Sequence, residues 1–170
     1  GGNYTGGLVG QNSGAIINSY ADNASVSGGV SGGLIGLVSG ENSVASCHAL
    51  GNVNGNAQAG GLIGAAQDAT SGSVKNSYAA CSFGGEADPF TPAQMLGIQN
   101  CYYLVDTTGG KTSQSAAQGK KYAELSVLSI EGAVELQNTV SYGQEGEYPF
   151  PVTNPVHYGN WPEKGEEEPI

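Results

Sequence analysis

Short apolar clusters recur along the first hundred residues, each bounded by glycine, asparagine or serine. The pair Leu8-Val9 returns as Leu34-Ile35 and as Leu62-Ile63, each time inside a Gly-Gly-Leu-Val/Ile-Gly unit that starts at residue 6, 32 or 60. Clusters this short suit strands separated by turns and are too short for helices. The regular return of one unit indicates a stacked repeat.

Two further elements follow each apolar cluster in constant order. The second is Asn-Ser-Tyr-Ala or a variant of it, with copies at 18–21, 46–49, 76–79 and 100–103. The third ends in glycine, with copies at 25–28, 52–55 and 81–84. Three short strands per repeat are typical of one coil of a β-solenoid. We therefore predict an all-β fold, a β-solenoid of about three coils resembling a right-handed β-helix, over residues 1–105.

Stacking predicts columns of equivalent side chains along the solenoid. One apolar column is expected to point inward and comprises Ile16, Val44, Val74 and Ile98 together with Leu8, Leu34 and Leu62. A second column holds the small side chains of Ser19, Cys47, Ser77 and Cys101. Strict alternation along a strand cannot point both columns inward, so a bend or bulge is expected between them.

The repeat pattern ends after residue 105. Residues 106–110 are expected to form a turn. Helical composition marks 122–128 and 130–138, whereas aromatic extended segments are expected at 148–151 and 156–162. We predict that residues 106–162 form a C-terminal cap with short helices, because a solenoid needs its open strand edge covered. Residues 163–170 are predicted to be an acidic linker. No comparable cap precedes the first coil, so further coils are expected in a longer parent chain.

Charge narrows the classes of partner. The net charge is −10, and all five basic residues are lysines. A chain without arginine lacks the guanidinium that favours phosphate recognition, and an acidic surface repels polyanions. No apolar run reaches the roughly 20 residues that a membrane-spanning helix needs. We therefore expect neither nucleic-acid binding nor membrane insertion.

The candidate chemistry is sparse. Cys47, Cys81 and Cys101 match no metal-binding spacing, and we favour buried thiols, although a bridge between one pair stays open. A Gly-x-Ser-x-Gly pattern at 29–33 lacks the strand-to-helix setting of a nucleophile elbow. The carboxylates of the repeat region are scattered over non-equivalent positions, at Asp22, Glu41, Asp68, Glu86 and Asp88. We therefore predict no catalytic residue, no cofactor and no metal site.

Aromatic rings recur at one coil position. This ladder comprises Tyr20, His48, Tyr78 and Tyr102. If the rings point outward, they form a flat surface on which a sugar or a protein partner could stack. The alternative is that they stack on one another and cover the coil.

The three repeated elements closely resemble the GLUG-motif repeats of bacterial surface proteins, over about residues 6–105. Such repeats occur in filamentous-haemagglutinin-like adhesins and in immunoglobulin A1 peptidases of Gram-positive bacteria. Two departures are His48, which replaces the usual aromatic residue, and the looser third coil after Phe83.

The resemblance implies a bacterial, exported protein, on the cell surface or secreted. The expected function is a non-catalytic structural or adhesion module of a larger protein. Its partners would be a host glycan or an extracellular protein, together with neighbouring domains of the parent chain. The alternatives are a carbohydrate-active β-helix enzyme and a substrate-positioning accessory module of a secreted peptidase.

Overall fold

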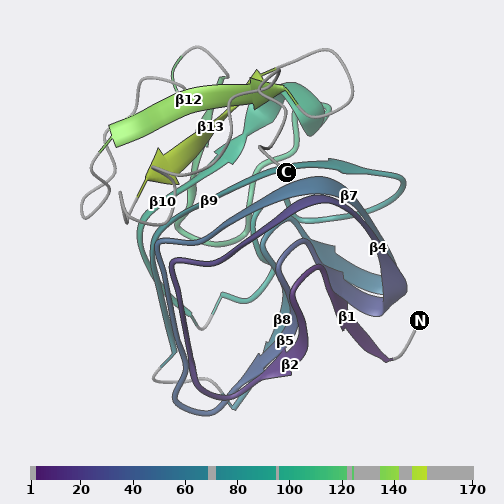
Figure 1. Cartoon of the computed structure of the whole chain (residues 1–170). Coiled ribbons are helices and arrows are strands. Elements are labelled where there is room, and N and C mark those ends of the chain that lie inside the picture. Colours follow the sequence, from purple (N-terminus) through teal and green to yellow (C-terminus); the bar gives the residue numbers. More distant parts are fainter. Residues whose placement is uncertain are drawn as a thin grey trace, which may run out of the picture.

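A computed structural model describes residues 3–68, 72–94, 96–121, 124, 135–141 and 147–152. Successive passes of the chain stack on one another as coils (Figure 1). The first coil contains β2 (Val9–Asn12), β3 (Ala15–Ile17) and β4 (Tyr20–Gly32), preceded by the short β1 (Tyr4–Gly6). The second coil contains β5 (Ile35–Ser39), β6 (Ser43–Ala45) and β7 (His48–Gly60).

The third coil contains β8 (Ile63–Gln67) and β9 (Ser73–Phe83). A partial fourth pass follows with β10 (Gly97–Leu104), the 3-10 turn η1 (Val105–Thr107) and β11 (Gln118–Lys120). The last described strands are β12 (Glu135–Ser141) and β13 (Glu147–Val152).

All strand pairs between coils are parallel within the described residues. One sheet has the order β2-β5-β8, and the larger sheet runs β1-β4-β7-β9-β10-β11, with β3 and β6 joined to it beside β9. The prediction of an all-β solenoid of about three coils is confirmed. It differs in one respect, because the second and third predicted elements form one continuous strand in β4, β7 and β9.

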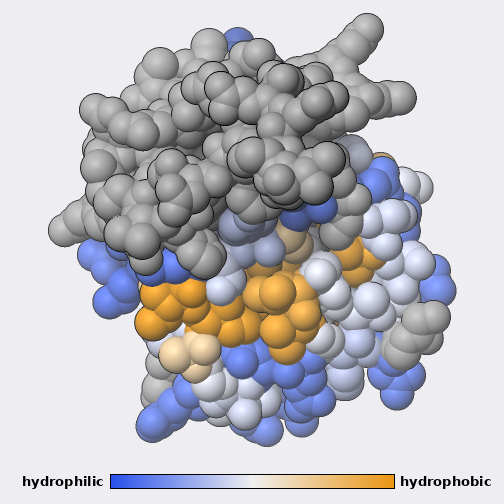
Figure 2. Space-filling model, viewed as in Figure 1, coloured by the Kyte–Doolittle hydropathy of each residue, from blue (hydrophilic) through white to orange (hydrophobic). Residues whose placement is uncertain are grey.

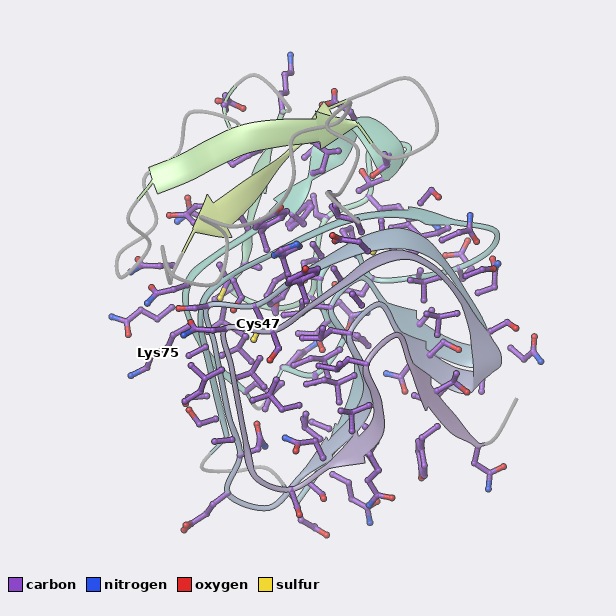
Figure 3. The ribbon with its side chains drawn as sticks, viewed as in Figure 1. Cys47 and Lys75 are labelled. Carbon is purple, nitrogen blue, oxygen red and sulfur yellow. The ribbon has the colours of Figure 1, made fainter. Side chains whose placement is uncertain are left out.

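The bulge between the two inward columns is present at one position of every coil. Asn18, Ser46, Asn76 and Asn100 have left-handed backbone conformations, with φ between 50° and 54°. Asparagine tolerates this region better than most residues. The turn resets the alternation, so Val44 and Cys47 are both buried, and Lys75 lies outside the coil while Cys47 lies inside (Figure 3). The predicted bend is therefore confirmed.

The core is built from the predicted columns, with one exception. Val44, Val74, Leu34 and Leu62 are fully buried, and Ile98 packs against the same cluster while partly buried. Leu8, predicted to join them, is 47% exposed. The prediction for Leu8 is wrong because no described coil lies over it on the N-terminal side.

The far end of the β2-β5-β8 sheet is closed by a segment that lies outside the repeat pattern. The carbonyl of Phe90 accepts hydrogen bonds from the backbone N–H groups of Leu62 and Ile63, and the Phe90 side chain is fully buried. The Asp88 carboxylate fixes this segment, because it accepts from the N–H of Phe90, the N–H of Gln114 and the hydroxyl of Ser113. Residues 88–91 therefore cover the last coil.

Only part of the predicted C-terminal cap is described. The turn predicted at 106–110 is confirmed by η1 and by the positive φ angles of Gly109 and Gly110. The helix predicted over 130–138 is wrong for residues 135–138, which belong to β12 and pair antiparallel with β13. Pairing with a partner strand overrides the helical composition of this segment. The extended segment predicted at 148–151 is confirmed in β13, while residues 122–123, 125–134 and 153–170 lie outside the described residues.

Candidate functional site

The aromatic ladder is brought together as the spacing predicts. Tyr20 lies opposite His48, His48 opposite Tyr78, and Tyr78 opposite Tyr102 in the parallel register. The rings of Tyr20 and His48 are parallel with centroids 4.9 Å apart, and those of His48 and Tyr78 are within 4° of parallel at 5.1 Å. These distances follow from the strand spacing of about 4.8 Å, which sets the separation of equivalent side chains.

The middle of the stack is closed to solvent. His48 is 1% exposed and Tyr78 is fully buried, whereas Tyr20 and Tyr102 at the two ends are half-buried. Ring faces inside the stack already contact each other, so the area that an external ring or sugar could contact is confined to the end residues. The ligand-face hypothesis stays a prediction, and the geometry restricts it to Tyr20 and Tyr102.

A buried hydrogen bond that the sequence did not predict lies beside the stack. Nε2 of His48 is 3.2 Å from Oδ1 of Asp22, which follows Tyr20 by two residues. A carboxylate only accepts hydrogen bonds, so Nε2 carries the proton. Burial lowers the pKa of His48, and the hydrogen bond and charge of Asp22 oppose this shift without reversing it. His48 is therefore neutral at pH 7, in agreement with its position between two rings.

The Asp22 side chain is only 9% exposed, and its second oxygen, Oδ2, is buried without a hydrogen-bond partner among the described groups. The same carboxylate contributes to raising the pKa of Tyr20, after the larger effect of burial. The only sequence signal for this pair was that Asp22 is the single charged residue among the first 40.

The cysteines are free and buried, which resolves the open question of a bridge. Cys47 and Cys101 belong to the small-residue column, and their Sγ atoms lie 3.1 Å and 3.3 Å from the carbonyls of Ala45 and Gln99. Burial raises the pKa of Cys81 and of Cys101 to about 12. Thiols with such pKa values are poor nucleophiles at neutral pH.

Three other candidate residues, Ser31, Asp88 and Glu86, make contacts within the fold. Ser31, the serine of the Gly-x-Ser-x-Gly pattern, lies inside β4, is fully buried and donates to the carbonyl of Asn54. Asp88 is occupied in holding the closing segment, and Glu86 pairs with Lys111 at 3.4 Å on the surface. Within the described ranges, no cluster of three or more histidine, cysteine or acidic side chains could hold a metal ion. No helix there is long and apolar enough to cross a membrane.

The parallel coils, the repeated columns and the repeated left-handed turn together define the fold as a β-solenoid built from a short tandem repeat. The chain also matches a known motif: the family model described as the GLUG motif covers residues 1–27. The resemblance to GLUG-motif repeats is therefore confirmed for the first of the stacked units. No curated protein and no solved structure matches the chain significantly.

Proposed function

We propose that this chain is a non-catalytic structural module of a larger exported bacterial protein, in which stacked coils hold other domains away from the cell surface and contribute to adhesion. The observation that carries the proposal is that the repeated residues pack against one another between coils. The leucine, valine, cysteine and glycine positions of the repeat are occupied by contacts between coils, which supports a scaffold role. The GLUG match supports a repeat domain of a larger protein.

The surface charge supports a partner that is not a polyanion. The net charge is −10, which disfavours nucleic acids and anionic membranes and is compatible with a neutral glycan or a protein partner outside the cell. The candidate contact area consists of the half-buried rings at the two ends of the ladder, Tyr20 and Tyr102. Aromatic faces bind sugars and proteins through large apolar contacts with a polar edge.

The test is binding of the purified chain to arrays of glycans and extracellular matrix proteins. The Tyr20→Ala and Tyr102→Ala variants are compared with Tyr4→Ala, a control that removes an exposed tyrosine outside the ladder. Binding that both ladder variants lose and the control keeps would support adhesion at the ladder. Binding to no array component would contradict adhesion and leave the spacer role alone.

The non-catalytic part of the proposal has its own assay. The chain is incubated with neutral and acidic polysaccharides, and new reducing ends are counted. Release of reducing ends above a heat-denatured sample would contradict it. In that event Asp22→Asn would be the first variant to measure, because Asp22 is the buried carboxylate with an unpartnered oxygen.

A further inference from the structure

The N-terminal end of the solenoid presents an uncovered apolar cross-section. Among the described residues, the exposed large hydrophobic side chains are Tyr4 (38%), Leu8 (47%) and Ile17 (56%). Ile17 belongs to a column that points outward in every coil, whereas Leu8 stands at an inward position of the first coil and is exposed because nothing described covers it. Figure 2 shows apolar side chains gathered inside the outline of this coil. Leu34, at the position equivalent to Leu8, is fully buried because coils cover it on both sides.

The strand edge at this end carries no lysine, no proline and no covering segment among the described residues. Proteins block such edges with lysine, proline or a covering segment. The first 40 residues contain no lysine and no proline, and Asp22 is their only charged residue. The opposite end is closed by Phe90, with Pro89 and Pro92 beside it. Within the described residues, the two ends are therefore chemically different, because the third coil is covered by the Phe90 segment and the first coil is not covered.

A hydrogen bond that recurs between coils shows which backbone group the first coil offers to a preceding one. Each coil has a backbone N–H that donates to the preceding coil, namely Ser43 to the carbonyl of Gly14, Ser73 to that of Asn42, and Gly97 to that of Gly72. Ala15 occupies this position in the first coil, opposite Ser43. Its N–H group is therefore directed toward the place where a preceding parallel coil would supply a carbonyl.

Glycine contacts restrict which chain can approach. A Cβ on Gly33 would overlap the carbonyl oxygen of Gly61 in the next coil, and a Cβ on Gly61 would overlap that of Pro89. By the same stacking, a chain that packs on Gly7 needs a residue without a Cβ at this position. The Gly-Gly-Leu unit of the repeat satisfies this requirement, whereas a strand with side chains at every position does not.

The register of β1 identifies the source of that chain. Val30–Gly32 at the end of β4 pairs with residues 58–60 at the end of β7, and Tyr4–Gly6 pairs with Val30–Gly32 in the same way. β1 therefore stands at the end of the long strand of a preceding coil. The chain already leads into the uncovered face.

We infer that this face is a docking surface for one more coil of the same Gly-Gly-Leu type, continuous with β1 in the same polypeptide and stacked in parallel register. The inference deepens the proposed structural role, since it makes the described coils one end of a longer stack. It does not depend on whether the module adheres to anything, and array binding and stacking are measured separately.

The test adds a coil to the chain. A copy of residues 33–60 is joined directly to Gly7. Gly60 of the copy then takes the place of Gly6, because both glycines pair with Gly32 in the strand register. The control carries Gly33→Val in the added copy alone, where the side chain would meet the carbonyl of Gly7. Amide exchange at Ala15, the thermal midpoint and the sedimentation mass are measured for both and for the unaltered chain.

We expect the unaltered chain to be a monomer with a rapidly exchanging Ala15 amide. The added coil should slow that exchange at least ~10-fold and raise the thermal midpoint by ~4 °C or more, and the control should do neither. Equal behaviour of the added coil and its control would overturn the inference. A dimeric unaltered chain whose Ala15 amide is already protected would also overturn it, because a second copy would then be the occupant.

Discussion

The close approach of successive coils makes a strong prediction about Gly33. An alanine Cβ at this position would overlap the carbonyl oxygen of Gly61 and would lie only 2.9 Å from Cβ of Ala49 and 3.0 Å from Sγ of Cys81. The overlapping atom is backbone, which cannot rotate away as the end of a side chain can. Relief requires two coils to separate locally, and the hydrogen bond from the Leu34 N–H to the carbonyl of Leu62, 3.0 Å long, lies at that point.

The magnitude follows from two opposing effects. Overpacking of a well-packed interior costs about 1–3 kcal/mol. Replacing glycine by alanine where the backbone permits it stabilises by about 0.4–1 kcal/mol through the unfolded state. Gly14 provides the matched control, because a Cβ there meets nothing within 4 Å. The gain through the unfolded state is common to both variants and cancels between them, so Gly33→Ala should be about 1–3 kcal/mol less stable than Gly14→Ala. In a chain of this length, that difference separates their thermal midpoints by roughly 3–9 °C.

The assay is thermal and urea unfolding of both variants beside the unaltered chain, followed by far-ultraviolet circular dichroism. Gly33→Ala is expected to unfold at lower temperature, and Gly14→Ala at the same or slightly higher temperature. If the two variants have the same thermal midpoint, the coils at Gly33 are not close enough for an alanine Cβ to overlap the carbonyl oxygen of Gly61. The same result would remove the glycine argument about which chain can cover the first coil.

Three other predictions follow from the buried polar groups. Asp88→Ala should destabilise the chain by about 3–5 kcal/mol in urea unfolding, because the N–H groups of Phe90 and Gln114 lose a charged acceptor; a loss below ~1 kcal/mol would contradict the anchoring role. Cys81 and Cys101 should resist a thiol reagent at pH 8 until urea unfolds the chain, since burial raises their pKa to about 12; labelling of both at the rate of a free thiol would refute their burial. Because burial lowers the pKa of His48 in the folded state, the unfolded chain binds the extra proton first as pH falls. Stability should be full above about pH 6.5 and decline below it, and His48→Tyr should flatten that decline in unfolding curves between pH 5 and 7; an unchanged slope would show that another group is responsible.

The repeat made most of the solenoid predictable from sequence. The Gly-Gly-Leu units fixed the period, and the conflict between the Val44 and Cys47 columns required a bulge, which Ser46 supplies with a φ of 54°. These features are local, or they arise because equivalent residues of successive coils stack on one another. The structure of one coil therefore predicts that of the next. The prediction that Leu8 is buried was wrong because the burial of this position depends on a coil on each side, and not on the local sequence.

The features missed by sequence reasoning are those made by residues outside the repeat. The Phe90 closure takes the place of the next Gly-Gly-Leu unit, because Phe90 follows Leu62 by 28 residues as Leu62 follows Leu34. Sequence reasoning missed it because Asp88-Pro89-Phe90 does not have the composition of that unit. The contact between Asp22 and His48 lies where the register of β4 and β7 shifts, between Ala21 and Ala24, and no repeated residue marks it in the sequence. The strand over residues 135–138 arises from pairing with β13, which composition alone does not encode.

The division between repeated and non-repeated residues also limits where recognition can lie. The repeated leucine, glycine, asparagine and small-residue positions are used in stacking and turning, so they offer the same chemistry in every coil. The outward position just before the left-handed turn is different, because it is occupied in successive coils by Ile17, Ala45, Lys75 and Gln99. This column crosses the outer surface on strands that the core holds rigidly, and its chemistry changes from coil to coil. A partner that distinguishes this solenoid from another with the same repeat has to contact side chains at positions of this kind, because stacking does not constrain which residues occupy them.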